Sequence, residues 1–250
     1  MSSLLKFEFK RVIRSKVLVM TAVLCVVIGG LGIVLNQVFY GSEGVGKQCL
    51  VSVFNSYTQF TYFILGFVFV QSFTKDYVGG ITCFYKQLGY SLTKQNLCKA
   101  IVMIIITVPI IDLLVVICNV LYKNSDVKFL LGIITAINLS TLYIILLALL
   151  ISTIFEHTVK AVLCFYGLFV IFNVLNFFMY GMVNPADGNS IVTYCITEWS
   201  GRQMSHHSID KLDMDLLKFK EYICVLLPMV WCAVLSLVDM ITLHKKDKKI

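Results

Sequence analysis

Residues 41–48, GSEGVGKQ, have a spacing that suggests nucleotide chemistry. Gly41, Gly46 and Lys47 match a P-loop, in which backbone amides and a lysine hold phosphates and a final Ser or Thr binds magnesium. Gln48 occupies that final position, and a long apolar run rather than a short strand precedes the loop. We therefore interpret the match as a coincidence in a glycine-rich turn.

Residues that could catalyse a reaction or bind a metal do not assemble into a known pattern. His206 and His207 are adjacent, so they do not share one helix face, and the sequence offers no third zinc ligand beside them. The chain has no HExxH or GxSxG motif and no pair of glutamates at helical spacing. We therefore expect no catalytic residues, no metal site and no cofactor in this chain.

Two carboxylates lie within apolar stretches, where an acidic side chain is costly and often functional. Asp112 has two interpretations: a packing residue hydrogen-bonded to Asn138 or Asn173, or a proton-linked carboxylate that lines a conduit. The packing interpretation is favoured because a lone acid is not a relay. Asp239 lies near the end of the last apolar stretch, where we expect it to reach lipid headgroups or Lys245.

The composition is typical of a membrane protein with several spans. The 250 residues are 58% hydrophobic and 14% charged, with a mean hydropathy of +0.86. A soluble domain has about 25% charged residues, so this chain has too little polar surface for a water-soluble globule. Nine cysteines at irregular spacing, without a CxxC pair, argue against a zinc site or a disulfide framework. The sequence leaves open whether Cys49 and Cys195 form a disulfide.

Six stretches are apolar and long enough to cross a bilayer, whose hydrocarbon core needs about 20 residues per helix. They cover residues 17–40, 52–73, 97–121, 128–155, 159–181 and 221–243. We therefore predict an all-α membrane protein in which residues 1–250 form a single transmembrane domain.

The positions of Lys and Arg predict the orientation, because the cytoplasmic loops of membrane proteins are enriched in these residues. With the N-terminus inside, 14 of the 21 basic residues face the cytoplasm, so we predict that both termini are cytoplasmic. The 41–48 loop then lies outside. The basic inner layer accounts for the net charge of +7, and no basic stripe with interleaved aromatic residues suggests binding to nucleic acid.

Residues 3–16 have the pattern of an amphipathic helix that lies in the headgroup layer before the first span. The apolar face consists of Leu5, Phe9, Val12 and Ile13, and the basic face consists of Lys6, Lys10 and Arg14. The alternative is a basic flank that only sets the topology of the chain.

The largest predicted cytoplasmic loop, residues 74–96, contains a second amphipathic pattern. Its apolar positions recur at i, i+4, i+7 and i+11, and they are Tyr77, Ile81, Phe84 and Leu88. Its polar back consists of Lys75, Asp76 and Lys86. Gly79 and Gly80 permit a bend near the start. The segment is either a helix that lies on the surface or a docking element for a groove on a cytoplasmic partner.

A long predicted outer segment, residues 182–220, separates the last two spans. Within it, residues 191–199 are apolar but too short to span, which suggests a re-entrant or interfacial segment anchored by Trp199. Residues 211–222 suggest a second short helix that leads into the last span.

The order of these elements, and residues 73–103 in particular, resemble the permease subunit of ABC type-2 exporters. That family shows an acidic residue followed by Gly-Thr, an apolar helical stretch, a break, and a lysine that opens the third span. The matching residues are Asp76, Gly80, Tyr85, Leu97 and Lys99. Ile81 stands where the family has threonine, with Thr82 displaced by one position.

The resemblance implies six transmembrane helices with an N-terminal interfacial helix, a cytoplasmic coupling helix and short outer helices between spans five and six. Two permease chains, identical or different, would surround the pathway, and a separate cytoplasmic ATPase subunit would use ATP and Mg. The implied ATPase-coupling residues are Asp76, Tyr77, Gly80, Ile81, Phe84, Tyr85 and Leu88. The implied interfacial-helix residues are Leu5, Phe9, Lys10, Val12 and Arg14. The alternative function is a stand-alone secondary transporter or channel that uses Asp112.

Within this family, the size of the chain and its ending, LHKKDKKI, resemble permeases that export amphipathic peptide toxins, the phenol-soluble modulins. Lantibiotic-immunity permeases share much of this layout. The resemblance therefore implies export of amphipathic peptides, either toxins or antimicrobial peptides, across the plasma membrane of a bacterium.

Overall fold

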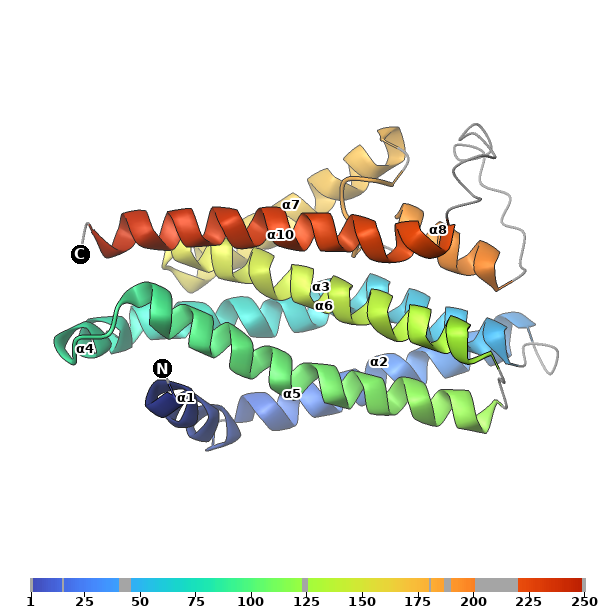
Figure 1. Cartoon of the computed structure of the whole chain (residues 1–250), viewed down its shortest axis with the longest axis horizontal. Helices are drawn as coiled ribbons and strands as arrows, with labels where there is room; N and C mark the ends of the chain where they lie inside the picture. Colours follow the sequence, from blue (N-terminus) through green and yellow to red (C-terminus); the bar gives the residue numbers. More distant parts are fainter. Residues whose placement is uncertain are drawn as a thin grey trace.

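The computed structural model of the chain describes residues 2–14, 16–40, 46–122, 126–179, 181–186, 190–200 and 220–248. Within these ranges the chain is largely helical and contains no strand. The helices are α1 (Ser2–Arg14), α2 (Lys16–Tyr40), α3 (Lys47–Val78), α4 (Ile81–Gln87), α5 (Leu92–Leu121), α6 (Val127–Phe155), α7 (Thr158–Phe178), α8 (Ile191–Trp199) and α10 (Lys220–Asp247). They form an elongated bundle, and we call the end that holds α1, α4 and the last turns of α10 the α4 end (Figure 1).

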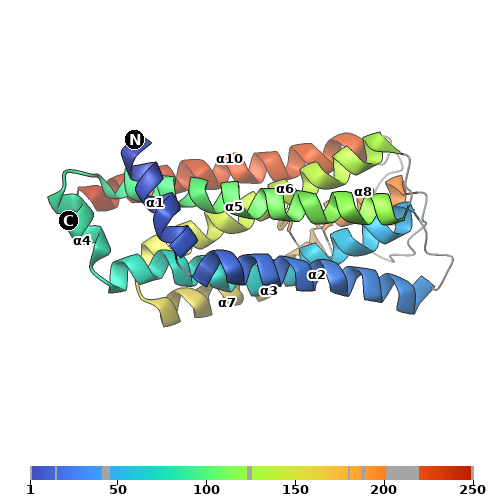
Figure 2. The same cartoon turned by 90° about the horizontal axis from the view of Figure 1, so that it is seen from below.

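Five helices, α3, α5, α6, α7 and α10, are each long and apolar enough to cross a membrane. A sixth candidate arises when α1 and α2 are taken together, although the two are bent by 66° relative to each other. Because α2 runs along the bundle and α1 turns across its α4 end, we describe α2 as the spanning part (Figure 2). The predicted all-α architecture is confirmed, and each predicted span overlaps one of these six long helices.

The local sequence explains where several helices begin and end. Gly80 has a positive φ of 66°, which favours glycine, and it separates the end of α3 at Val78 from the start of α4 at Ile81. Ser91 and Asp126 precede α5 and α6, and each side chain accepts a hydrogen bond from a backbone amide in the first turn. Such caps satisfy amides that have no partner within the helix.

The break at Gly80 divides the amphipathic pattern that the sequence shows after residue 74. Tyr77 belongs to the last turn of α3, whereas Ile81 and Phe84 belong to α4 and Leu88 caps its end. The expectation of one helix carrying all four apolar residues is therefore wrong. Tyr77 is hydrogen-bonded within the bundle, whereas Phe84 and Leu88 are exposed.

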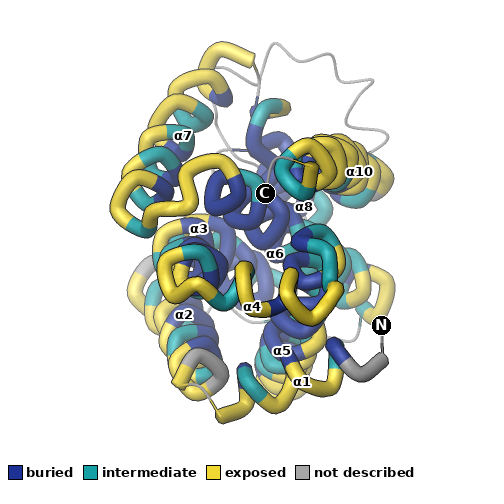
Figure 3. The backbone as a smooth tube through the Cα atoms, turned by 90° about the vertical axis from the view of Figure 1, so that its left-hand side faces the viewer, coloured by how far each residue is buried: buried dark blue, intermediate teal, exposed yellow. Residues whose placement is uncertain are grey.

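The helices α3 and α6 occupy the centre of the bundle and are its most buried long helices (Figure 3). Tyr62 of α3 stacks on Phe165 of α7, with 4.6 Å between ring centroids, and lies 4.5 Å from the ring of Phe169. This contact requires Gly66 in the next turn of α3, because a Cβ atom there would lie 2.4 Å from the Phe165 ring. Aromatic packing onto a small residue therefore fixes α7 against the core.

The short helix α8 lies at the end of the bundle opposite α4 and is almost fully buried (Figure 1). Trp199 packs against α6, where a Cβ atom on Gly132 would lie 2.4 Å from the indole ring. The segment predicted as re-entrant or interfacial is therefore a short buried helix. Of the second predicted short helix, only the part that starts α10 is described, and residues 211–219, His206 and His207 lie outside the described residues.

The residues that resemble a P-loop lie where α3 begins, and residues 41–45 are outside the described part. Gly46 precedes α3, and Lys47 forms an ion pair with Asp126 at 2.5 Å. Lys47 also lies 5.3 Å from the ring centroid of Phe129. The hydrogen bond from Lys47 lowers the pKa of the Asp126 carboxyl. The lysine of the apparent motif therefore joins α3 to α6, and helix α2 precedes it where a P-loop needs a strand.

Candidate functional site

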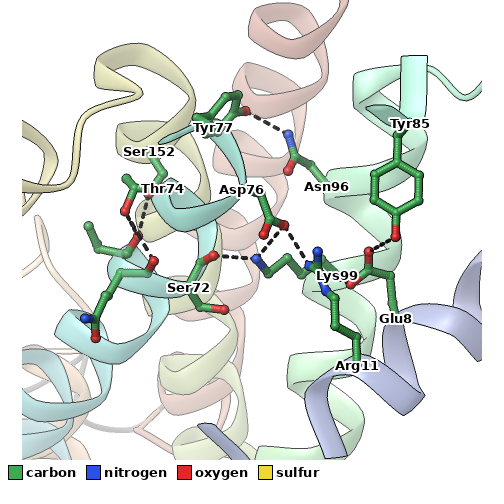
Figure 4. Close-up of polar contacts among 12 residues, drawn as sticks. Glu8, Arg11, Ser72, Thr74, Asp76, Tyr77, Tyr85, Asn96, Lys99 and Ser152 are labelled. Carbon is green, nitrogen blue, oxygen red and sulfur yellow. Dashed lines mark hydrogen bonds and ion pairs between the residues drawn. The ribbon is translucent and has the colours of Figure 1, made fainter. Parts of the chain in front are cut away.

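The α4 end contains a cluster of buried charges that joins α1, α3 and α5. Asp76 of α3 accepts hydrogen bonds at 2.7 Å from Arg11 Nη2 and from Lys99 Nζ (Figure 4). Asp76 and Lys99 are only 3% and 2% exposed. Glu8 forms an ion pair with Arg11 at 2.8 Å. We call these four residues, Glu8, Arg11, Asp76 and Lys99, the ionic cluster.

Opposite charges compensate each other in the ionic cluster. Lys99 Nζ donates to the backbone carbonyl of Ser72 as well as to Asp76, and it lies 5.5 Å from the ring centroid of Phe73. Removing one partner of a buried ion pair costs about 3–5 kcal/mol, because the other charge stays buried without compensation. The ionic cluster therefore holds α1, α3 and α5 in one arrangement.

Tyr85 connects α4 to the ionic cluster. Its hydroxyl donates to Glu8 Oε1 at 2.9 Å (Figure 4). Its ring packs with Leu4 of α1 and Cys98 of α5. Burial raises the pKa of the Glu8 carboxyl, although Arg11 opposes this change. Burial and the neighbouring Glu8 carboxylate raise the pKa of the Tyr85 hydroxyl. Tyr85 therefore stays a hydrogen-bond donor that fixes α4 to its neighbours.

Three apolar side chains at the α4 end do not take part in this packing. Val78, Phe84 and Leu88 are 65%, 55% and 56% exposed. Among the predicted docking residues, Phe84 and Leu88 therefore lie at the surface, whereas Tyr85 is buried and Ile81 is partly buried against it. Val78 belongs to the end of α3, and we call the other two residues, Phe84 and Leu88, the exposed α4 face.

Tyr77, which the sequence pattern places among the docking residues, faces the bundle. Its hydroxyl accepts a hydrogen bond from Asn96 Nδ2 at 2.9 Å and donates one to Thr153 Oγ1 at 3.4 Å. Lys246 Nζ lies 4.5 Å from the Tyr77 ring centroid, donates to the carbonyl of Thr153 and pairs with Glu156. Tyr77 therefore links α3 to α5, α6 and α10.

Asp247, the last residue of α10, binds the start of α5. Its carboxylate accepts hydrogen bonds from the Leu92 amide at 2.7 Å, the Thr93 amide at 3.3 Å and the Thr93 hydroxyl at 2.9 Å. A carboxylate at a helix N-terminus satisfies free amides and interacts favourably with the helix dipole. We call Lys246 and Asp247 the C-terminal clamp, because they tie α10 to α5 and α6.

The face that α1 presents to the bundle differs from the predicted apolar face. Leu5 and Val12 face the bundle, whereas Phe9 is exposed. Ile13, Lys6, Lys10 and Arg14 are also exposed. The inward face includes Glu8 and Arg11, which apolar periodicity overlooks. The signal for them in the sequence was an oppositely charged i, i+3 pair on the same helix face as Leu5 and Val12.

The two carboxylates within apolar helices have different surroundings. Asp112 Oδ1 accepts a hydrogen bond from Asn138 Nδ2 at 2.8 Å, as the packing interpretation expects. Asp239 is buried, and neither of its carboxylate oxygens has a hydrogen-bond partner among the described residues. The expectation that it reaches headgroups or Lys245 is therefore wrong. The reason is that α10 continues to Asp247, which places Asp239 two turns inside the helix.

Neither metal ligands nor disulfides appear in the parts of the chain that the structure describes. No three His, Cys, Asp or Glu side chains gather there at distances that fit a metal ion. All nine cysteines are free thiols, so Cys49 and Cys195 do not form the disulfide that the sequence left open. Cys83 on α4 is exposed, Cys164 is partly exposed, and the other seven cysteines are buried.

A comparison with families of known proteins gives a match over nearly the whole chain, and the matched range contains the ionic cluster and the exposed α4 face. The model of one family, described as peptide export permease protein YydJ, matches residues 5–250. No curated protein matches the sequence. The family match extends from α1 to beyond the end of α10. The chain therefore belongs to the peptide export permease protein YydJ family.

Proposed function

We propose that the chain is the membrane-spanning subunit of an ATP-driven ABC exporter that moves amphipathic peptides out of a bacterial cell. A separate cytoplasmic ATPase subunit hydrolyses ATP with Mg and docks on the exposed α4 face, and a second permease chain completes the pathway. The family supports peptide export. The observation that carries the docking proposal is an apolar surface on a short helix that is itself fixed to buried charges.

The exposed α4 face has the properties of a docking element. Phe84 and Leu88 are exposed beside Lys86 and Gln87, which are exposed polar residues of the same helix. A short helix that presents apolar side chains on a polar background fits a hydrophobic groove on a partner. Full burial of a side chain such as Phe or Leu contributes about 1.5–3 kcal/mol, so two of them would give a partner a substantial part of its affinity.

The contacts of α4 explain how a partner's movement would reach the membrane helices. Tyr85 ties α4 to Glu8 of α1, and Arg11 of α1 is bound to Asp76 of α3. Gly80, with its positive φ, gives the chain a bend between α3 and α4 at which the angle between them can change. In this proposal a force on α4 moves α1 and the end of α3 together.

The core between α3 and α6 supports a pathway that lies between two permease chains. A cavity lined by residues of these two helices, with Tyr57 and Ser140 among them, and by Ala186 has a volume of about 10 Å³. This volume suits a single water molecule rather than a peptide. We therefore place the peptide route at the surface of the bundle, where a second chain supplies the other wall.

Co-purification tests this function. The chain is expressed with its neighbouring genes, and the amount of ATPase subunit that purifies with it is measured. Replacing Phe84 and Leu88 with Ser is expected to weaken retention on the order of 100-fold, because about 3 kcal/mol of apolar burial is lost. The matched control replaces Lys86 and Gln87 with Ser on the same helix and is expected to retain the ATPase.

The docking variant leaves Tyr77 and Ile81 unchanged, although both belong to the predicted apolar pattern. Replacing them together with Phe84 would disturb the packing of α3 and α4 as well as the surface. If the wild-type chain retains no ATPase subunit, the exporter proposal fails. If the variant at Phe84 and Leu88 retains as much ATPase as the control, the ATPase does not dock on the exposed α4 face.

A further inference from the structure

A cavity of about 470 Å³ lies at the α4 end, beside the ionic cluster. Its walls come from α1, α2, α3 and α5, together with the first residue of α4. The lining residues are Arg11, Val12, Lys16, Met20, Val68, Gln71, Ser72, Lys75, Asp76, Ile81 and Lys99. This volume lies within the range of small-molecule sites in proteins, about 300–1,000 Å³.

The polar half of the cavity wall carries an excess of positive charge. Four lining residues are cationic, namely Arg11, Lys16, Lys75 and Lys99, and one lining residue, Asp76, is acidic. Asp76 is already bound by Arg11 and Lys99. Lys16 and Lys75 are exposed, and neither forms an ion pair with another described residue. The cavity wall therefore contains two cations, Lys16 and Lys75, that no acidic side chain of the described residues neutralises.

The other half of the cavity wall is apolar and continues onto the outside of α2. Met20 lines the cavity and is also 44% exposed. Val19, directly before Met20, and Val23 and Val27, further along α2, are exposed as well. A ligand whose polar end lies between Lys16 and Lys75 would therefore have an apolar surface for its other end.

We propose that this cavity binds the headgroup of an anionic phospholipid. Lys16 and Lys75 contact its phosphate, and an acyl chain lies along Met20 and Val23 of α2. Basic pockets between membrane helices are suited to anionic headgroups, because the phosphate gains charge-assisted hydrogen bonds. Free phosphate shares the polar part of this chemistry, but it would leave Met20, which is 44% exposed, without a ligand group to pack against.

The bound lipid would join α2 to α3, whereas the ionic cluster joins α1, α3 and α5. Lys16 begins α2, and Lys75 lies in the last turn of α3. A phosphate between them would hold the start of α2 near the end of α3, next to the bend at Gly80. This inference concerns the membrane-inserted chain alone and does not depend on the ATPase or on the exported peptide.

The test uses the purified full chain in neutral detergent, with lipid retention measured by native mass spectrometry and stability measured by thermal unfolding. Phosphatidylglycerol, phosphatidylcholine and inorganic phosphate are added in separate arms. Phosphatidylglycerol is expected to be retained and to raise the unfolding midpoint, and phosphatidylcholine is not. Replacing Lys16 and Lys75 with Gln is expected to weaken phosphatidylglycerol binding by at least tenfold, on the order of the contribution of two basic residues.

The matched control removes two other exposed lysines at the α4 end, Lys86 and Lys94, which do not line the cavity. This control is expected to bind phosphatidylglycerol as the wild type does. Should the double variant fail to purify as a folded protein, Lys75→Gln alone is used, with a several-fold loss expected. Equal binding by the cavity variant and the control would overturn the proposal. Equal stabilisation by inorganic phosphate would overturn its assignment to a lipid.

Discussion

The ionic cluster can be tested by removing the negative charge of Asp76 and measuring the change in the free energy of unfolding. Asp76→Asn removes the carboxylate that faces Lys99 Nζ and Arg11 Nη2 at 2.7 Å each. At an effective dielectric constant of about 20, each contact has a gross attraction of about 6 kcal/mol, which the desolvation of the charges opposes. Arg11 keeps its ion pair with Glu8, whereas the hydrogen bond that Lys99 keeps is the one to the Ser72 carbonyl, which carries no charge. We therefore expect a net loss of about 3–5 kcal/mol in the free energy of unfolding.

Adding Lys99→Met to Asp76→Asn should restore part of this loss. The second substitution removes the buried cation that the first leaves without a counter-charge, and methionine fills a similar volume. The double variant is therefore expected to be more stable than Asp76→Asn alone. The assay is thermal unfolding of the purified chain in detergent, where 3–5 kcal/mol corresponds to a lower midpoint by about 10 °C for a chain of this length.

The matched control for the Asp76 and Lys99 variants is Lys86→Gln, which removes an exposed charge at the same end of the bundle. Its effect on the free energy of unfolding is expected to stay within about 0.5 kcal/mol. If the Asp76→Asn variant were as stable as this control, Asp76 would not stabilise the chain by compensating buried Lys99. A double variant less stable than Asp76→Asn alone would lead to the same conclusion, because the loss would then not arise from an uncompensated Lys99.

Three further predictions concern the C-terminal clamp, the aromatic packing and pH. Asp247→Ala should destabilise the chain by about 1 kcal/mol and speed amide hydrogen exchange at the start of α5, because its amides lose their acceptor. Gly66→Ala should cost about 1–3 kcal/mol in thermal unfolding, since its Cβ meets the Phe165 ring, whereas Gly167→Ala meets nothing within 4 Å and should be neutral or slightly stabilising. Burial raises the pKa of Glu8 above its ordinary value of 4.5. The folded chain then binds more protons than the unfolded chain, so its unfolding free energy should fall as pH rises from about 4.5 through the raised pKa, and Glu8→Gln should reduce this slope.

The sequence predicts the helical architecture well, because membrane spans depend on long apolar runs that are visible without tertiary information. The family match confirms the resemblance to a peptide exporter permease that the order of elements suggested. The ends of the spans are less well predicted. The helices α3 and α10 continue to Val78 and Asp247, past the apolar runs, because polar residues at their ends find partners in the bundle.

The charged residues at the α4 end were harder to predict, because their partners are distant in the sequence. The Tyr85 hydroxyl reaches Glu8 across 77 positions, and Lys246 reaches Thr153 across 93 positions. Apolar periodicity assigns such polar residues to the solvent face, although here they face inward. The same reasoning placed Tyr77 on a docking surface, because a local pattern does not show the bend at Gly80.

The thiol of Cys83 allows a direct test, without any substitution, of whether a partner ATPase docks on the exposed α4 face. Cys83 lies on α4 next to Phe84 and is the exposed cysteine of the chain. The measurement is the rate at which a membrane-impermeant maleimide labels Cys83 in inside-out vesicles, with and without the ATPase subunit. If the ATPase docks there, Cys83 is labelled rapidly in the chain alone and is strongly protected when the ATPase is bound. An equal labelling rate in both samples would contradict docking on this face.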